Sequence, residues 1–146
     1  TNVLVKRFIN LGVAVALENG LIVPVIKHAE EKNFLGLTRA LADLSGRARA
    51  KQLKPDEIMG GTFTVTNMGS FGNTFGVPII NQPQVGILGV GAIVKRPVVI
   101  DEMIAIRDIM YLSLSYDHRT VDGALGGLFI ERVRQVLEGD ELLGSL

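Results

Sequence analysis

The stretch Leu112–Ala124 changes its hydrophobic period within a few residues. It begins with strict alternation, which places Leu112 and Leu114 on one face of a strand and two serines on the other. After Asp122 the apolar residues recur at helical spacing instead. A strand that runs directly into a helix restricts the chain to folds that combine a sheet with helices. His118, one of only two histidines, lies on the connection.

The rest of the chain shows the same mixture of patterns. A helical period that begins at Leu35 predicts an amphipathic helix that ends near Leu53, before Pro55. Glu18-Asn19-Gly20 is typical of a tight hairpin. Pro24 lacks a backbone donor, so its strand is expected at a sheet edge or with an irregularity. The expected strands are Phe8–Leu17, Leu21–Ile26, Thr62–Asn67, Val85–Val90, Ile93–Ile100 and Met103–Tyr116; a long loop spans Met68–Pro83, and a last helix spans Asp122–Gly139.

Composition argues against several classes of function. Fifteen basic residues balance fifteen acidic ones, so no net field would recruit nucleic acid or an anionic membrane. The chain has no cysteine, which excludes disulfides and thiolate catalysis. The longest apolar run, Gly20–Ile26, is too short for a membrane span, and the first residues do not resemble a signal peptide. We expect one domain over residues 1–146, and a mean hydropathy of +0.33 indicates buried subunit contacts.

Neither the glycines nor the histidines form a familiar binding motif. The cluster Gly69–Gly76 lacks the Lys-Ser/Thr pair of a phosphate-binding loop. The cluster around Gly89 precedes strand-like sequence, not the helix of a dinucleotide fingerprint. His28 and His118 are ninety residues apart and have no paired ligands at helical spacing. We therefore expect no metal site, and we expect His28 on the surface.

His118 has two interpretations. In the first, Asp117 or Asp122 caps the following helix, which stabilises it by about 1 kcal/mol, and the histidine merely lies on the connection. In the second, the imidazole is a general base that Asp122, four residues further on, could orient. The chain has no cysteine and no Gly-x-Ser-x-Gly elbow, so such a base would activate a thiol or hydroxyl of the substrate. Spacing alone leaves both interpretations open.

Four motifs, taken together, resemble a known family. Asp117–Ala124 resembles the His-Arg-x-x-Asp-Gly signature of the dihydrolipoamide acyltransferases, the core subunits of 2-oxo acid dehydrogenase complexes. The segments Gly20–Ile26, Gly61–Gly69, and Pro78–Pro83 with Gly86–Gly91 also resemble this family and occur in its order. The resemblance covers nearly the whole chain.

The resemblance implies both a fold and a reaction. The fold would be that of chloramphenicol acetyltransferase, an α/β two-layer sandwich with a mixed sheet and helices on one side. Coenzyme A and lipoamide would be the substrates, with His118 as general base on the thiol, Asp122 supporting the site geometry and Thr66 stabilising the tetrahedral oxyanion. Thr66 stands where the family has serine, so the hydroxyl is kept and a methyl group is added. By itself Thr66 is typical of a half-buried strand in which threonines alternate with Phe63 and Val65.

An assembly is implied as well. Family members form trimers with active sites between subunits, and an apolar tail, here Leu142 and Leu143, docks the trimers into a hollow cage. The implied partners are the decarboxylating dehydrogenase and dihydrolipoamide dehydrogenase components. The family's catalytic domain begins upstream of this sequence, and its lipoyl and subunit-binding domains lie further upstream, so residues 1–146 are expected to be part of the catalytic domain. The expected location is the prokaryotic cytoplasm, or the mitochondrial matrix in a eukaryote.

Two other functions are compatible with these residues. One is a stand-alone, coenzyme A-dependent acetyltransferase that acts on a small hydroxyl acceptor. The other is a non-catalytic scaffold subunit of the cage. A pure scaffold would be expected to lose the histidine, the aspartate or the hydroxyl, and the chain has all three.

Overall fold

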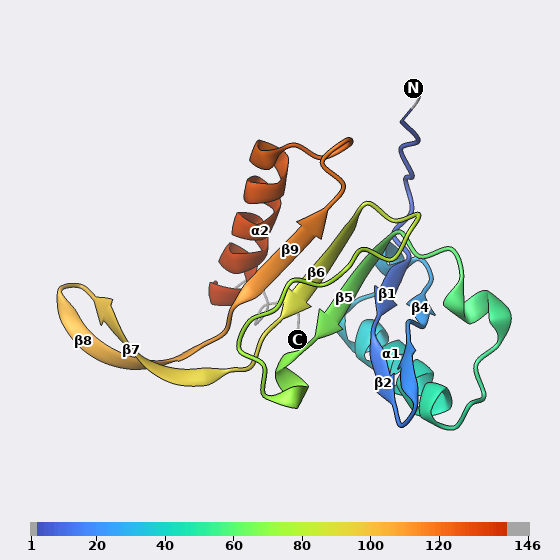
Figure 1. Cartoon of the computed structure of the whole chain (residues 1–146), viewed down its shortest axis with the longest axis horizontal. Coiled ribbons are helices and arrows are strands. Elements are labelled where there is room, and N and C mark those ends of the chain that lie inside the picture. The colour runs from blue at the N-terminus through green and yellow to red at the C-terminus, as the bar shows by residue number, and fades with distance from the viewer. Residues whose placement is uncertain (1–2, 140–146) are drawn as a thin grey trace.

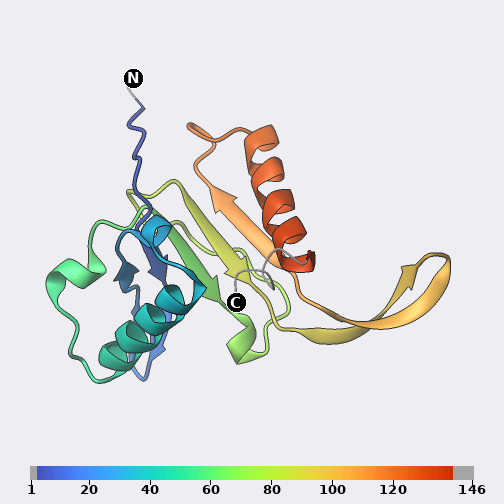
Figure 2. The same cartoon turned by 180° about the vertical axis from the view of Figure 1, so that it is seen from behind.

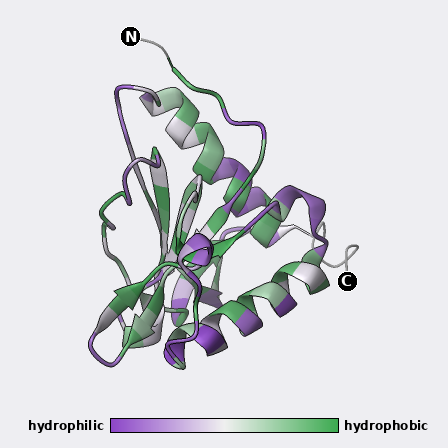
Figure 3. Cartoon of the chain, turned by 90° about the vertical axis from the view of Figure 1, so that its right-hand side faces the viewer, coloured by the Kyte–Doolittle hydropathy of each residue, from purple (hydrophilic) through white to green (hydrophobic). Residues whose placement is uncertain are grey.

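A mixed five-stranded sheet forms the centre of the computed structural model, which describes residues 3–139. The strand order is β4-β1-β5-β6-β9, in which β1, β5 and β6 are parallel and the two edge strands are antiparallel to their neighbours. Both helices lie on one side of this sheet (Figures 2 and 3). The predicted two-layer α/β sandwich is confirmed. The five strands are β1 (Leu11–Val13), β4 (Val25–Ile26), β5 (Phe63–Asn67), β6 (Gly86–Val90) and β9 (Leu112–Tyr116).

Two separate two-stranded ribbons extend from the sheet. The first pairs β2 (Val15–Leu17) with β3 (Gly20–Ile22), and the second pairs β7 (Val94–Ile100) with β8 (Met103–Ile109). The single strand predicted from Phe8 to Leu17 is therefore wrong. The chain passes from the sheet to a ribbon at Ala14, whose amide donates to the Val65 carbonyl. Pro24 interrupts the return strand between β3 and β4, and β4 is an edge, as predicted.

The predicted strand Met103–Tyr116 is also two strands. β8 ends at Ile109, and β9 begins at Leu112 after the chain turns back into the sheet. Asp101 and Glu102 form the predicted hairpin turn, with φ values of 49° and 62°. Sequence pattern did not separate β8 from β9 because both are rich in apolar and β-branched residues.

The two helices are α1 (Phe34–Arg49) and α2 (Gly123–Glu138), and neither is long and apolar enough to cross a membrane. α1 ends earlier than the predicted Leu53 because Lys51 adopts a left-handed conformation with φ 57°. Pro55 instead opens a short 3-10 turn. That turn is Pro55–Ile58, and two further 3-10 turns of the described residues are Ala29–Glu31 and Gly69–Phe71.

An ion-pair network holds α1 to the 3-10 turn that follows it. The Arg47 guanidinium lies 2.7 Å from carboxylate oxygens of both Asp43 and Glu57. Its hydrogen bonds lower the pKa of Glu57 to about 2.

The core reverses the burial expected for β5. Thr64 is fully buried, and its hydroxyl donates to Oε1 of Gln84 at 2.7 Å. Phe63 and Val65, which point to the side of the helices, are only half-buried. That side retains an apolar groove of about 580 Å³, lined among others by Phe63, Val65, Leu88 and Phe129. The face of the sheet carrying Thr64 is covered instead by the loop that follows β5 (Figure 1).

Candidate active site

His118 lies on an exposed turn that joins β9 to α2. The turn is closed by the amides of Thr120 and Val121, which both donate to the carbonyl of Asp117 at 3.0 Å. The imidazole lies against the ring of Tyr116, with 5.6 Å between ring centroids. Within residues 3–139 it has no hydrogen-bond partner, so both ring nitrogens are available to a ligand or to another subunit.

The carboxylate of Asp117, which directly precedes His118, interacts with Arg119. Asp117 accepts from the Arg119 amide at 3.0 Å and pairs with the Arg119 guanidinium at 2.6 Å. These hydrogen bonds lower the pKa of Asp117 to about 2. Asp117 therefore stays ionised near neutral pH.

Asp122 is the N-cap of α2. Its Oδ1 accepts from the Leu125 amide at 2.8 Å, which confirms the interpretation of Asp122 as a helix cap. No hydrogen bond joins Asp122 to His118 within the described part of the chain. Asp122 can therefore support the histidine only by fixing where the turn ends and α2 begins. Gly126 brings α2 close to β9, since a Cβ there would lie 2.7 Å from the Tyr116 ring.

Thr66 lies near the carboxyl end of β5 and is half-buried. Its hydroxyl makes no hydrogen bond within residues 3–139, and the side chain lines a hollow of about 410 Å³ together with Met68 and Asn73. Directly opposite Thr66, Gly89 leaves room that the side chains of Met68 and Ser113 fill. A Cβ on Gly89 would lie 2.5 Å from Ser113 Oγ.

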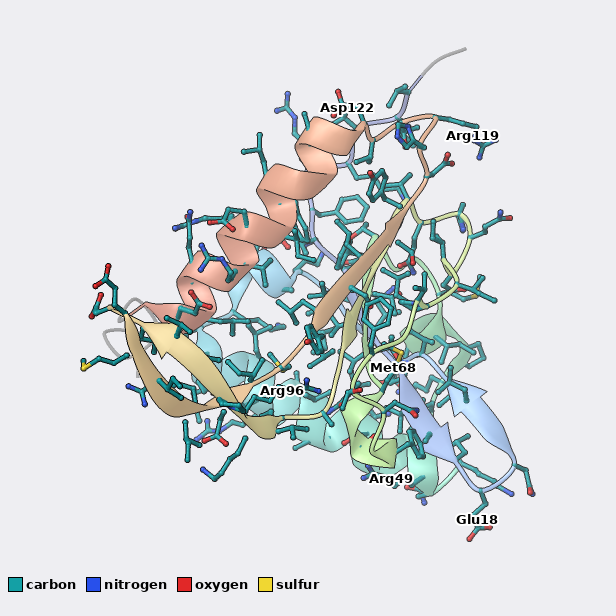
Figure 4. The ribbon with its side chains drawn as sticks, turned by 60° about the vertical axis from the view of Figure 1, so that its left-hand side comes forward. Glu18, Arg49, Met68, Arg96, Arg119 and Asp122 are labelled. Atoms are coloured by element: carbon teal, nitrogen blue, oxygen red, sulfur yellow. The ribbon has the colours of Figure 1, made fainter. Side chains whose placement is uncertain are left out.

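The structure places Thr66 and His118 at opposite ends of the sheet. Thr66 is paired with Gly89 of β6, whereas Tyr116 is paired with Gly86 at the start of that strand. Three residues of strand span about 10 Å, and His118 lies a further two residues beyond Tyr116. Figure 4 shows the same division, with Arg119 and Asp122 at one end and Met68, which directly follows β5, well away from them. One chain therefore does not bring its own Thr66 hydroxyl to its own His118 imidazole.

Sequence reasoning missed two features of the sheet face that the loop after β5 covers. Met68 and Ser113 pack over Gly89, and the hydroxyls of Ser113 and Ser115 are buried without a hydrogen-bond partner among the described residues. The serines were predicted on the face of β9 opposite to Leu114, but their burial depends on the loop after β5. No local pattern indicates where that loop folds back.

The other histidine forms a surface cluster. His28 is exposed, as predicted, and its Nδ1 lies 3.2 Å from Glu30 and 3.7 Å from Glu31. The spacing argument did not anticipate this grouping of potential metal ligands. All three side chains are exposed, and Glu30 also accepts from the Ile9 amide. No other feature of residues 3–139 points to an ion there. Leu142 and Leu143, the predicted tail contacts, lie outside the described residues.

Comparison with known sequences gives consistent matches. A family model described as 2-oxoacid dehydrogenases acyltransferase (catalytic domain) matches residues 1–144. The lipoamide acyltransferase component of the branched-chain alpha-keto acid dehydrogenase complex of Bacillus subtilis is 51% identical over 91% of this chain and 32% of that protein. The dihydrolipoyllysine-residue acetyltransferase component of the pyruvate dehydrogenase complex of Mycobacterium tuberculosis is 52% identical over 88% of this chain and 24% of that protein. The chain thus spans about a quarter to a third of the length of these relatives.

Solved structures match the fold equally well. A probable dihydrolipoamide acetyltransferase from Listeria monocytogenes has a TM-score of 0.88 and 47% identity over 91% of this chain and 57% of that chain. The Azotobacter vinelandii dihydrolipoamide acetyltransferase, in which the catalytic roles of a serine, a histidine and an asparagine were investigated, has a TM-score of 0.88 and 37% identity over 94% and 57% of the two chains. The cubic core of a pyruvate dehydrogenase multienzyme complex matches with the same values.

Proposed function

Because the chain belongs to the 2-oxoacid dehydrogenase acyltransferase (catalytic domain) family, we propose that it transfers an acyl group between dihydrolipoamide and coenzyme A. His118 of one copy and Thr66 of a neighbouring copy would form the site. The proposal rests on the positions of the His118 imidazole and the Thr66 hydroxyl, which lie at opposite ends of one sheet. Neither group makes a hydrogen bond to another of the described residues 3–139. A second copy can bring them together, whereas one chain does not.

The spacing of three residues supports the assignment. The serine, histidine and asparagine investigated in the Azotobacter vinelandii enzyme are separated by 52 and 4 positions, and Thr66, His118 and Asp122 are separated by the same numbers. Both differences are conservative: threonine keeps the hydroxyl of serine, and aspartate keeps the oxygen with which asparagine would cap a helix. We assign Asp122 as a positioning residue, because it fixes the start of α2 and so the end of the His118 turn.

His118 would act as general base and then as general acid. Its neutral imidazole takes the proton from the attacking thiol, and the sulfur adds to the thioester carbonyl to give a tetrahedral intermediate. When the intermediate collapses, the carbon–sulfur bond to the departing thiol breaks and the imidazolium returns its proton to that sulfur. The same steps run in both directions, since both acyl carriers are thiols.

Thr66 would stabilise the charge that develops during addition. Its hydroxyl would donate to the oxyanion of the tetrahedral intermediate, and removal of one such donor typically lowers kcat by about 100-fold to 1,000-fold. The strand holds the Thr66 backbone in place, so the donor is positioned before the reaction begins.

The proposed setting is a trimer within a larger hollow core. The matched cubic core of a pyruvate dehydrogenase complex supports assembly into a multienzyme core. The decarboxylating dehydrogenase and dihydrolipoamide dehydrogenase components would be its partners, and the compartment would be the cytoplasm of a prokaryote or the mitochondrial matrix.

Mixing two inactive variants tests the cross-copy site. We expect Thr66→Val and His118→Ala each to have little activity with dihydrolipoamide and acetyl-coenzyme A. When the two variants are co-expressed, random association pairs an intact Thr66 with an intact His118 at roughly a quarter of the interfaces, so activity should return to about that fraction. Mixed assemblies that stay inactive would contradict the cross-copy site. Near-normal turnover by His118→Ala alone would overturn the assignment of the base.

A further inference from the structure

A buried hydrogen bond joins the middle of β5 to the segment that leads into β6. The Thr64 hydroxyl donates to Oε1 of Gln84 at 2.7 Å. Thr64 is fully buried and Gln84 is only 9% exposed. Because both groups are shielded from solvent, loss of one partner would leave the other unsatisfied. A buried polar pair costs desolvation, so its position in the fold is informative.

Gln84 lies one residue before the position that holds the His118 turn. The carbonyl of Val85 accepts from the Asp117 amide at 2.9 Å, and the Asp117 carbonyl in turn accepts from the two amides that close the turn. Gln84 itself lines a hollow of about 600 Å³ together with Gln82, Asp117 and His118. Figure 1 shows the start of β6 and the connection from β9 to α2 at the same end of the sheet. A displacement of Gln84 is therefore transmitted to the turn through one residue and one backbone hydrogen bond.

The same hydrogen bond relates this end of the sheet to the strand that carries Thr66. Thr64 and Thr66 are two residues apart in β5, so their side chains lie on the same face. In the sheet, Thr64 is paired with Ile87, and Ile87 is paired with Ser115 of β9. A contact at Thr64 therefore fixes the position of the His118 turn relative to β5.

We propose that Gln84 is a positioning residue, which through Thr64 holds the His118 turn in a fixed place relative to Thr66 of the same chain. The inference rests on the proposed function. If His118 of one copy meets Thr66 of another, every copy must present both groups at a fixed separation for each site to be complete. A misplacement of about 1 Å in a catalytic geometry can lower the rate about 100-fold. Gln84 thus contributes to turnover without touching the reacting atoms.

A set of substitutions separates positioning from stability. Thr64→Val keeps the shape of the side chain but leaves Gln84 unpaired. Thr64→Val combined with Gln84→Met replaces both partners by apolar groups, which can be nearly neutral for stability because no polar atom is left unpaired. Thr64→Ser keeps the donor. Thr62→Val is the matched control, because Thr62 belongs to the same run of threonines and its hydroxyl bonds to the backbone of Asn10 instead.

Acyl transfer between acetyl-coenzyme A and dihydrolipoamide is the first measurement, with thermal melts of the same samples. We expect Thr64→Val to lower kcat about 10-fold and to change KM by less than about 2-fold, because the base is misplaced while substrate contacts remain. The double variant should regain the melting temperature but not kcat, and Thr64→Ser and Thr62→Val should keep kcat. A double variant that regains both would overturn the proposal, since the hydrogen bond would then serve stability alone. An unchanged kcat in Thr64→Val would overturn it as well.

A second measurement reports on His118 without using activity. The chain has two histidines, so carbethoxylation by diethyl pyrocarbonate can be followed at each by mass spectrometry of peptides, with His28 as the internal standard. Release of the turn should raise the rate at His118 relative to that at His28 in Thr64→Val and in the double variant. If Thr64→Val does not fold, Gln84→Asn is a milder way to break the contact, because it shortens the side chain by one methylene group. An unchanged ratio of the two rates in folded variants would refute the positioning role.

The two measurements also distinguish this inference from the proposed function. If the unsubstituted chain transfers no acyl group while the ratio of the carbethoxylation rates responds to Thr64→Val, the proposed reaction is wrong and the link between β5 and the His118 turn stands. If acyl transfer is present but neither kcat nor the ratio responds to Thr64→Val, the reaction stands and the positioning role of Gln84 is wrong.

Discussion

The two ends of the five-stranded sheet differ in how they hold their candidate catalytic residue. The Thr66 end is closely packed at Gly89, where Met68 and Ser113 fill the space, and Thr66 itself lines a hollow of about 410 Å³. The His118 end is open, with an exposed turn on which Asp117 and Arg119 form an ion pair. An oxyanion donor must be rigid, whereas a base must meet substrates that enter and leave. The contrast fits a site to which one copy contributes the donor and another the base.

Removing the base should have the largest effect. His118→Ala is expected to lower kcat for acyl transfer by at least about 100-fold, the usual contribution of a positioned acid–base group. Release of free thiol from acetyl-coenzyme A and dihydrolipoamide measures it. His28→Ala is the matched control, since His28 is the other histidine and is also exposed. Comparable losses in the two variants would show that the effect is not specific to the turn.

Removing the Thr66 hydroxyl should lower kcat nearly as much as removing the His118 imidazole. Thr66→Val keeps the shape of the side chain and its suitability for a strand but removes the hydroxyl, so kcat should fall by about 100-fold with little change in KM. Thr66→Ser should retain most of the activity, because only a methyl group is lost. If Thr66→Val and Thr66→Ser behave alike, the hydroxyl is not the stabilising group.

The substitution Gly89→Ala tests how closely the Thr66 end is packed. Gly89→Ala would place a methyl group 2.5 Å from Ser113 Oγ and 2.6 Å from Met68 Cε. We expect a loss of about 1–3 kcal/mol in the free energy of unfolding, measured in urea, because the site has no room for added volume. Gly127→Ala on α2, where no atom lies within 4 Å, should instead stabilise the chain by up to about 1 kcal/mol. If Gly89→Ala leaves the free energy of unfolding unchanged, the Thr66 end is less closely packed than the structure indicates.

At the open end, helix-cap variants distinguish an effect on the position of His118 from an effect on stability. Asp122→Ala should cost about 1 kcal/mol of unfolding free energy and also lower kcat, because the His118 turn loses its fixed end. Asn33→Ala removes the equivalent cap of α1, where Asn33 accepts from the Gly36 amide at 2.8 Å. It should cause a similar loss of stability with no loss of turnover. Equal kinetic effects of the two variants would remove Asp122 from the site.

The smallest expected effect is on stability at low pH. Because the pKa of Asp117 falls from 3.8 to about 2 on folding, the unfolded chain binds more protons between these values. The stabilisation is therefore complete above about pH 4 and is lost as the pH falls toward 2. Asp117→Asn should flatten this part of the stability curve in thermal melts at pH 7, 4 and 2.5, while the contribution of Glu57 stays equal in both proteins. An unchanged curve would contradict the lowered pKa.

Local patterns predicted much of the fold. The period change around Asp122, the alternation of β5 and the helical spacing after Leu35 each identified an element of the correct type. Errors occurred where tertiary pairing decides: Ala14 and Tyr111 lie where the chain leaves one sheet for another, and nothing in the adjacent residues marks that change.

The sequence by itself determined the residue types of the site, the spacing of Thr66, His118 and Asp122, and the helix that Asp122 caps, because these depend on neighbours along the chain. Only the tertiary structure decided that Thr66 and His118 lie at opposite ends of the sheet. β9 runs antiparallel to β6, and β6 runs parallel to β5, so the ends of β9 and β5 point in opposite directions. Strand direction within a sheet is a long-range property. The residues alone therefore did not place Thr66 and His118 at opposite ends, although the family resemblance had implied a site between subunits.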